Sequence, residues 1–321
     1  MNFYFQYIKK VFRLLCVLSK EKDIPRWYCF YDYFKSLLRH SCLIRQYVYG
    51  NFWKISEAQR KKVLTYRRIS KLFDQLNQKS YIHFLENKND FNSFFKDFVH
   101  RDWLYVTESS FEDFQKFTQK HHVVVVKPLR GVEGGGIRRL LVDKIPDQLE
   151  EVYLQLKDED VLVEELIVQH PEMCFGNMSV NTIRTHTILD RDGKAHVIKA
   201  ILRVGVGSTF VDNYAKGGAI YEVDVMEGIV CSYGRNHAGE VIVKHPQTDI
   251  VMLGRKIPLW EEVVAISKNA AEHLPEVRFI GWDVAIGKDR VQLIEGNHNP
   301  DYELLEFFGS GGYYEKIKRY I

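Results

Sequence analysis

Two carboxylates and an amide near the C-terminus have the residue types and spacing of a divalent-cation site. Asp283 lies in one predicted strand, and Glu295 and Asn297 lie in the next. Residues two apart project from the same face of a strand, so Glu295 and Asn297 point the same way. Hard oxygen ligands, with positions left open for water and phosphate, suit Mg²⁺. The sequence therefore predicts a site for one or two Mg²⁺ ions; the alternative is a polar stripe that faces solvent.

The turn between these two strands sets their register. If residues 288–290 form a three-residue loop, Val284 pairs with Ile294 and Asp283 pairs with Glu295. Directly opposed residues have Cβ atoms about 4.5–5.5 Å apart. Two carboxylates at that distance repel each other unless a cation lies between them. The register thus supports the metal site.

A second predicted hairpin carries cationic side chains suited to anionic oxygens. Its strands, residues 181–189 and 195–205, flank an Asp-Arg-Asp-Gly turn. Any even-length loop places six side chains, most of them polar, on one face: Thr182, Arg184, His186, Lys199, Ile201 and Arg203. The other face is a plausible core: Ile183, Leu189, Ile198, Ala200, Leu202 and Val204. Because arginine binds phosphate and carboxylate bidentately, we expect an anion site here, with simple solvent exposure as the alternative.

Lys127 lies near the end of a predicted buried strand, and a glycine-rich segment follows it. The segment contains Gly134, Gly135 and Gly136. Glycines let backbone N–H groups approach phosphates closely and allow a flap to move. The spacing fits neither G-x-x-x-x-G-K-[ST] nor a well-formed G-x-G-x-x-G, so a P-loop and a Rossmann motif are not supported.

The elements that must position these groups are helices followed by mixed strands and helices. Residues 1–75 are predicted to be mainly helical, and residues 81–120 continue in that style with a core of Phe91, Phe94, Phe95 and Phe98. Strands are predicted at 122–128, 161–166, 181–189, 195–205, 218–223 and 228–232, a helix at 259–273, and two last strands around Asp283 and Glu295. This pattern predicts an α+β architecture. The expected domains are 1–75, 76–165 and 166–321.

Composition and charge narrow the class of protein. Of 321 residues, 45% are hydrophobic and 27% charged, which is typical of a globular protein, and no apolar run approaches the ~20 residues of a membrane span. An N-terminal signal peptide is not expected, because Arg13 interrupts the apolar stretch and no small-residue cleavage site follows. Five cysteines without a C-x-x-C pair argue against a disulfide framework and a zinc site, and they suit a reducing cytoplasm.

The N-terminal region is strongly basic. Residues 1–70 carry 15 Lys and Arg against 4 Asp and Glu, a net charge of +11, so the rest of the chain carries −8 for a total of +3. An apolar stripe is expected on the first helix, made by Tyr4, Ile8, Phe12 and Leu15. Two interpretations stay open: the stripe packs on the rest of the protein, or the helix lies on a membrane.

Taken in order, these segments resemble the ATP-grasp superfamily, and more narrowly its sugar-transfer-associated branch found with bacterial polysaccharide genes. The matching segments are residues 125–128 with the glycine-rich flap, 163–167, 169–170, 179–184, 211–214 with 217–218, 281–283 and 295–297. The resemblance covers about residues 72–306 and implies two α+β lobes that clamp ATP, with a helical N-terminal extension.

The resemblance also implies roles for individual residues. Lys127 would contact the ATP phosphates beneath the flap, and Lys79 would be the earlier lysine of the small lobe. Arg184 and Arg203 would hold the γ-phosphate or the acyl phosphate formed from it. Glu164, Glu165, Leu166 and Ile167 would form a hinge that binds adenine and ribose. The substrate would lie near His170, Asn181, Asn213, Gly217, Gly218 and His298. His186 and His298 are candidates for a general base.

The function that follows is that of an ATP-dependent carboxylate–amine ligase. It would form a C–N bond through an acyl phosphate, with a uronic acid or related acceptor of bacterial surface polysaccharide (a sugar or lipid-linked glycan precursor) as substrate. The expected partners are ATP, Mg²⁺, a carboxylate and an amine, and no nucleic acid. The expected location is cytoplasmic, with a peripheral membrane contact through residues 1–20 left open. Two alternatives remain: an ATP-grasp phosphotransferase, and a non-catalytic nucleotide-binding partner of a glycosyltransferase.

Overall fold

The structure is a computed structural model in which the chain divides into two compact units. The helical unit comprises Met1–Leu76 with Asn299–Ile321, and the sheet unit comprises Asn77–His298. The domain limits expected from the sequence remain predictions. The residues described are 2–129, 135–176, 179–206, 217–237, 240–245, 247–301, 303–306, 308 and 311–321.

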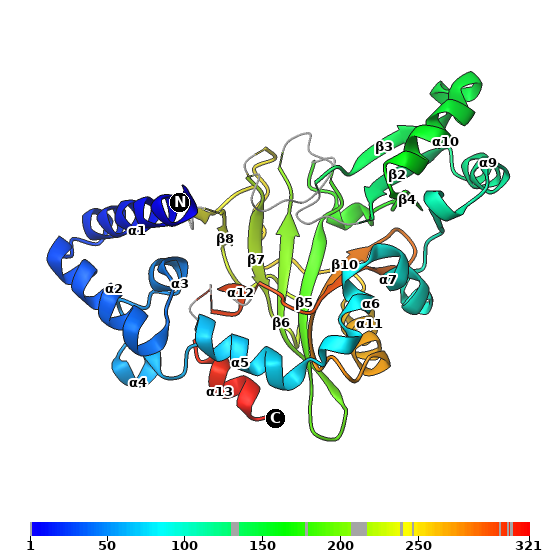
Figure 1. Ribbon diagram of the computed structural model, residues 1–321. Coiled ribbons are helices and arrows are strands. Elements are labelled where there is room, and N and C mark those ends of the chain that lie inside the picture. Colours follow the sequence, from blue (N-terminus) through cyan, green and yellow to red (C-terminus); the bar gives the residue numbers. More distant parts are fainter. Residues whose placement is uncertain are drawn as a thin grey trace. The chain divides into compact units, whose positions relative to one another are not determined.

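The helical unit is built from short amphipathic helices around one core. Its helices are α1 (Asn2–Glu21), α2 (Arg26–His40), α3 (Ile44–Tyr49), α4 (Glu57–Arg60), α5 (Tyr66–Leu76), α12 (Glu303–Glu306) and α13 (Tyr313–Lys318) (Figure 1). In α1, Leu15 is buried, whereas Ile8 and Phe12 are exposed, so Ile8 and Phe12 of the expected stripe do not pack into the core. The core-facing side of α1 is instead made by Val11, Leu15 and Leu18. Within the described part of the chain, no helix is long and apolar enough to cross a membrane.

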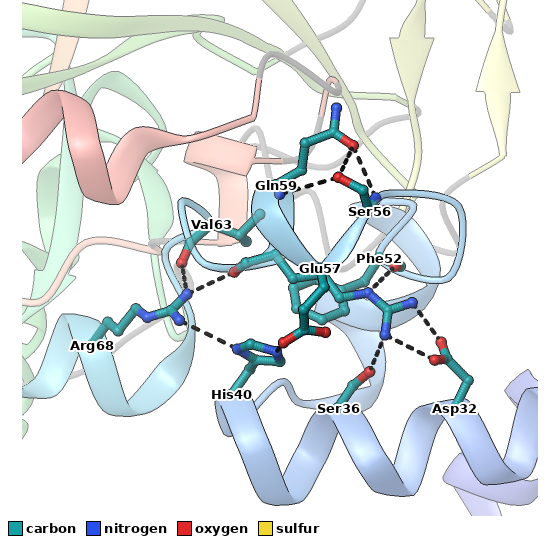
Figure 2. Close-up of polar contacts among 10 residues, drawn as sticks. Asp32, Ser36, His40, Phe52, Ser56, Glu57, Gln59, Val63 and Arg68 are labelled. Atoms are coloured by element: carbon teal, nitrogen blue, oxygen red, sulfur yellow. Dashed lines mark hydrogen bonds and ion pairs between the residues drawn. The ribbon is translucent and has the colours of Figure 1, made fainter.

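A buried ion pair fixes the inner face of α2. Arg60 binds both carboxylate oxygens of Asp32, at 2.8 and 2.7 Å, and donates to the Ser36 hydroxyl at 3.1 Å. Its Nε also donates to the carbonyl oxygen of Phe52 at 3.1 Å, and Figure 2 shows Asp32, Ser36 and Phe52 converging on this guanidinium. The Tyr47 hydroxyl donates to the same Asp32 carboxylate at 2.8 Å. A buried charge pair with this many hydrogen bonds holds α2 in one position on the unit.

The sheet unit contains two antiparallel sheets. The small sheet has the strand order β1-β4-β2-β3, and its strands are β1 (Trp103–Tyr105), β2 (Val123–Pro128), β3 (Arg138–Leu141) and β4 (Val161–Glu165). The large sheet has the order β11-β10-β5-β6-β7-β8-β9. Its strands are β5 (Thr182–Leu189), β6 (Ala195–Val204), β7 (Ala219–Val223), β8 (Gly234–Arg235), β9 (Val241–Ile242), β10 (Phe279–Ile286) and β11 (Val291–Asn297).

Helices cover one face of each sheet. The short helices that precede the small sheet are α6 (His83–Glu86), α7 (Lys88–Phe94) and α8 (Lys96–Val99), and single 3₁₀ turns are η1 (Lys79–Tyr81), η2 (Val106–Glu108), η3 (Val142–Lys144), η4 (Pro146–Gln148) and η5 (Pro171–Met173). Helices α9 (Phe111–Lys120) and α10 (Leu149–Asp158) pack on Val124, Val126 and Val163 of the small sheet (Figure 1). Helix α11 (Trp260–His273) packs on the core of the large sheet through Val263 and Ala270.

The mixed α+β architecture expected from the sequence is confirmed, with differences in detail. Helix α9 begins after Ser110, whose hydroxyl accepts from the Asp113 N–H in a capping box. The strand expected at residues 228–232 is wrong. Gly228 has φ +69° and lies in a turn, and only isolated bridges at Ile229 and Val230 follow it. Phe91 and Phe95 are buried as expected.

Each of the two hairpins that carry predicted site residues contains a β-bulge. In β10–β11, Ile286 pairs with Val291 and Val284 pairs with Leu293, so the expected pairing of Val284 with Ile294 is wrong. A register shift at Ile294 then brings Asp283 opposite Glu295. The extra residue in the strand offsets the extra residue in the loop.

The β5–β6 hairpin uses the same compensation. Leu189 pairs with Ala195, so the loop has an odd length, and a register shift between His186 and Thr187 follows. Beyond the shift, Thr182 pairs with Arg203, Arg184 with Ile201 and His186 with Lys199, so these side chains share one face of the sheet, as expected. Ile198, placed in the core by the sequence, is only half-buried because it lies at the shift.

Candidate functional site

Asp283 lies at the centre of a buried charge cluster on the large sheet. On β10 it is flanked by Arg184 of β5 on one side and Glu295 of β11 on the other. Arg184 binds the Asp283 carboxylate through Nε and, at 2.9 Å, through a terminal nitrogen. Arg203 of β6 reaches the same carboxylate at 2.7 Å. Asn297 donates to Glu295 at 3.3 Å. All five predicted residues therefore come together at one place.

The two carboxylates differ in their pKa values. Burial alone would raise the pKa of Asp283, but the charges of Arg184 and Arg203 outweigh burial and hold it well below its ordinary value. Burial raises the pKa of Glu295, and the neighbouring charge of Asp283 raises it further. Glu295 is therefore the member of the pair that needs a further cation in order to ionise.

A second buried cluster lies on the small sheet around Glu164 of β4. Lys127 of β2 binds Glu164 at 2.5 Å, and Arg101 binds it through Nε at 2.8 Å and a terminal nitrogen at 3.2 Å. The Asn92 amide of α7 donates to it at 3.0 Å. Burial would raise the pKa of Glu164, but Arg101 and Lys127 hold it far below its ordinary value. The Glu164 carboxylate is thus occupied by protein groups, rather than turned outward to a ribose.

Lys88 electrostatically links the two clusters. Burial lowers the pKa of its ammonium, and the carboxylates of Glu295 and Glu164 oppose that effect. The pKa of Lys127 is likewise lowered by burial and supported by Glu164 and, more weakly, Glu295. Two lysines therefore lie within the field of both carboxylates. Arg101 also ties the sheets together, because it donates to the Leu293 carbonyl oxygen of β11 at 2.5 Å.

The segment after β4 connects the two sheets, where the sequence predicts a hinge. Glu164 and Glu165 project from opposite faces of β4 because they are adjacent in a strand. The Glu165 carboxylate accepts from the Asp102 N–H at 3.1 Å, in a pocket also lined by His121 and Lys120. Leu166 and Ile167 are half-buried in the connection.

This connection runs beside the β10–β11 turn. The Val168 carbonyl oxygen accepts from the Lys288 N–H at 2.8 Å, and the His170 N–H donates to Ile286 at 3.0 Å. The hinge role of these residues stays a prediction.

The structure describes part of the predicted glycine-rich flap, and it describes Lys79, the lysine expected in the small lobe. Gly135 and Gly136 form the turn before β3, and Gly136 has φ +76°. A Cβ atom there would lie 2.8 Å from the Pro128 side chain, so glycine is required on two grounds. Gly134 lies outside the described residues. Lys79 lies in η1 with its side chain exposed, whereas the charges of Glu295 and Glu164 act on the ammonium of Lys88.

The predicted substrate residues fall in several places. Asn181 is fully buried, and its amide donates to the Met173 carbonyl oxygen at 2.7 Å and accepts from the Gly205 N–H at 3.1 Å, which is a structural arrangement. His170 caps η5 by accepting from the Glu172 N–H at 3.2 Å.

The remaining predicted substrate residues lie near strand ends. His298 directly follows β11 and lies 4.0 Å from Glu86, and burial lowers its pKa. Gly217 and Gly218 precede β7, and Asn213 lies outside the described residues.

His186 is poorly suited to accept a proton. Burial, together with the charges of Arg184 and Lys199, lowers the pKa of its ring to about 3. Lys199, on the same face, is directed at Glu222 of β7. A ring with so low a pKa stays neutral but is a weak base near pH 7.

Sequence reasoning missed three members of the site: Lys88, Asn92 and Arg101. Asn92 had a usable signal, because it shares a helical face with Phe95 and Val99, and a polar residue among buried apolar ones needs a polar partner. Lys88 and Arg101 have no motif around them. Glu164 and Leu293, which Arg101 binds, lie 63 and 192 residues away from it in the sequence, so only the tertiary structure shows these contacts.

The donor set around Glu295 fits a magnesium ion. Asp283, Glu295 and Asn297 supply two carboxylates and an amide on one strand pair, which are the hard ligands that Mg²⁺ accepts. The raised pKa of Glu295 points the same way, because a divalent cation is the partner that would allow both carboxylates to be ionised together.

Comparison with solved structures finds distant similarity to several ligases. The ATP-grasp ligase PsnB, solved with a phosphomimetic variant of its minimal precursor, Mg and ADP, is 16% identical with a TM-score of 0.46, over 75% of this chain and 59% of PsnB. The L-amino acid ligase from Bacillus licheniformis is 13% identical (TM-score 0.45; 74% and 49% covered), and the D-cycloserine synthetase DcsG is 12% identical (TM-score 0.44; 79% and 80%). The chain thus spans about three fifths of PsnB and half of the L-amino acid ligase.

The family is identified at the level of sequence. No curated protein matches the chain. Residues 67–319 match the family described as sugar-transfer associated ATP-grasp, which covers most of the chain and contains both charge clusters. The chain therefore belongs to the sugar-transfer associated ATP-grasp family.

Proposed function

We propose that this protein is an ATP- and Mg²⁺-dependent ligase that joins a carboxylate to an amine. The observation that carries the proposal is the convergence of carboxylates and cations in the sheet unit. Asp283 and Glu295 face each other, Arg184 and Arg203 bind Asp283, and Lys88 lies in the field of Glu295. Carboxylates for a metal beside fixed cations are the groups needed to bind a nucleotide triphosphate and stabilise the charge that its transfer develops.

Asp283, Glu295 and Asn297 would hold the magnesium. When bound, the ion neutralises charge on the phosphate oxygens. Arg184 and Arg203 lie at the same carboxylate and are the groups suited to the γ-phosphate, because guanidinium binds phosphate bidentately. Lys127 and Lys88 would face the other phosphates, since both lie in the field of Glu164 and Glu295.

The reaction follows from the demands of the chemistry. A substrate carboxylate oxygen forms a bond to the γ-phosphorus of ATP, and the bond from that phosphorus to the β-phosphate bridging oxygen breaks, which releases ADP. The amine then attacks the carbonyl carbon of the acyl phosphate, and inorganic phosphate and a proton leave as the amide forms. The cationic side chains reduce the repulsion between the attacking carboxylate and the triphosphate. A glycan acceptor, such as a uronic acid of a surface polysaccharide precursor, is the substrate class that the family's description supports.

The proposal is tested by ATP turnover with Mg²⁺, using pools of uronic acids, nucleotide sugars and amino acids. Release of ADP and free phosphate only when both a carboxylate and an amine are present supports the ligase. Release of ADP with phosphate retained on the acceptor identifies a phosphotransferase instead. Binding of ATP without turnover in any pool would indicate a nucleotide-binding partner, and absence of ATP binding by calorimetry would overturn the assignment.

A further inference from the structure

The outer face of helix α2 carries an apolar stripe that the fold of its own unit does not use. Trp27, Tyr31, Phe34 and Leu38 are 71%, 59%, 47% and 84% exposed. They follow one another at i, i+4, i+7 and i+11, so they line one side of the helix. The buried face of α2, with Cys29, Tyr33 and Ser36, is on the opposite side. Helix α2 therefore carries an exposed apolar face that its own core does not cover.

Helix α1 extends this surface. Phe5, Ile8 and Phe12 follow at i, i+3 and i+7, and each is more than half exposed. The Phe12 ring contacts Phe30 of α2, with the ring centroids 4.8 Å apart, so the exposed side of α1 adjoins α2. We call the seven exposed side chains the aromatic surface: Phe5, Ile8, Phe12, Trp27, Tyr31, Phe34 and Leu38. An exposed apolar surface of this kind on a folded unit marks an interaction site.

The charged residues of α1, α2 and the turn between them are predominantly positive. Residues 1–40 contain eight Lys and Arg and only three acidic residues. One of the acids, Asp32, is buried and bound by Arg60. Lys9 lies over the Phe5 ring at 4.5 Å, and Lys35 lies over Tyr31 at 5.8 Å, so ammonium groups sit at the edge of the surface itself.

We propose that the aromatic surface docks on an anionic lipid bilayer, with α1 and α2 lying on the membrane and Trp27 at the headgroup level. Trp and Tyr favour the membrane interface, and interleaved Lys and Arg attract anionic headgroups. The core of a protein–protein interface is depleted of lysine, so the lysines bound to these rings favour lipid over a protein partner.

The fold presents this surface on a fixed support. The inner face of α2 is held by the hydrogen-bonded Asp32–Arg60 pair with Ser36 and Phe52 (Figure 2). A helix anchored in this way does not need to reorganise before it binds, which lowers the cost of docking. The surface uses none of the residues assigned to the nucleotide site, so the proposal does not depend on the proposed reaction.

The test is co-sedimentation of the full-length chain with vesicles of phosphatidylcholine alone and of phosphatidylcholine with phosphatidylglycerol. We expect binding to the anionic vesicles, at least about tenfold stronger than to neutral ones and weakened by added salt. Trp27→Ser combined with Phe34→Ser should reduce the partition coefficient by about tenfold or more. Lys35→Glu combined with Arg39→Glu should abolish the preference for anionic lipid.

The control variants are Leu154→Ser of α10 and Met226→Ser, which also remove exposed apolar side chains, and both should bind vesicles like the wild type. Circular dichroism melts confirm that the surface variants are folded. Equal binding to both vesicle types, no vesicle binding, or unchanged binding of the variants would overturn the proposal. So would a wild-type dimer in sedimentation velocity that the Trp27→Ser and Phe34→Ser changes dissociate without any vesicle binding, because the surface would then join two copies of the chain.

Discussion

Asp283 and Glu295 face each other directly across β10 and β11, where Asp283 is buried and Glu295 is half-buried. Their environments are unequal, because Arg184 and Arg203 both bind Asp283. The negative charge is therefore concentrated on Asp283. Ionising Glu295 costs free energy, because burial and the charge of Asp283 both raise its pKa. This asymmetry gives the two carboxylates opposite effects on stability.

Replacing Glu295 with Gln should abolish turnover without harming the fold. The amide keeps the shape of the side chain but cannot carry the charge that burial and Asp283 oppose, so stability in the absence of metal should be unchanged or higher by up to about 1 kcal/mol. The stabilisation by Mg²⁺ with ATP should be lost. Thermal melts with and without Mg²⁺–ATP, together with ADP release, measure both effects.

The matched control for this change is Asp289→Asn in the exposed β10–β11 turn, which also removes one carboxylate from the same hairpin. It should retain turnover and the Mg²⁺-dependent shift in melting temperature. Full turnover by the Glu295→Gln variant would remove Glu295 from the metal site.

Replacing Asp283 with Asn should instead destabilise the sheet unit strongly. The change leaves the guanidinium groups of Arg184 and Arg203 without the carboxylate that both bind in a largely buried site. Breaking one side of a buried ion pair costs about 3–5 kcal/mol. Urea denaturation should show this loss, and a variant that unfolds within about 1 kcal/mol of the wild type would mean that the arginines are satisfied in another way.

Lys88 should matter more for nucleotide binding than Lys79. Lys88 lies in the field of both Glu295 and Glu164, whereas Lys79 lies on η1 with its side chain exposed. We expect Lys88→Ala to weaken ATP binding by about tenfold, equivalent to about 1.4 kcal/mol, and Lys79→Ala to change it by less than about threefold. Calorimetric titration with a non-hydrolysable ATP analogue compares the two. The reverse order would restore Lys79 as the nucleotide lysine of the small lobe.

The sequence predicted most of the strands, and it predicted that Asp283, Glu295 and Asn297 come together, because these signals are local. Large apolar residues at every second position mark β10, and the positions of Asp283 and Glu295 relative to one turn define their pairing. The loop length was mispredicted in both hairpins, but bulges at Ile294 and Ile198 restored the expected pairs. A bulge adds one residue to a strand and has no sequence motif here, so the sequence of the strand does not reveal it.

The contacts around Glu164 could not be predicted from the sequence, for a different reason. Glu164 fits a nucleotide hinge by position, yet Arg101 of the segment before β1 and Lys127 of β2 bind its carboxylate. Each partner is an ordinary charged residue in a charged chain, and only the packing of β1, β2 and β4 into one sheet brings them together. Long-range ion pairs of this kind have no spacing rule comparable to those within a helix.

His186 should make stability depend on pH. Its folded pKa of about 3 lies below the unfolded value near 6.5, so the unfolded state binds the proton more readily between these values. The stability that neutral His186 provides is fully present above about pH 6.5 and is lost as pH falls below it, by on the order of 1 kcal/mol per pH unit. The groups acting on the ring are Arg184 and Lys199, which disfavour protonation, and Asp283, which favours it.

His186→Leu should remove this slope. Neither ring nitrogen has a hydrogen-bond partner among the described residues, so an apolar side chain of similar size should cost little at pH 7.5. Urea denaturation of both proteins from pH 7.5 to pH 5 gives the comparison. The wild type should lose stability faster than the variant as pH falls, because other titrating groups, such as His40 and His298, are common to both proteins. Parallel curves would mean that His186 becomes protonated in the folded state over this range, which the two neighbouring cations oppose.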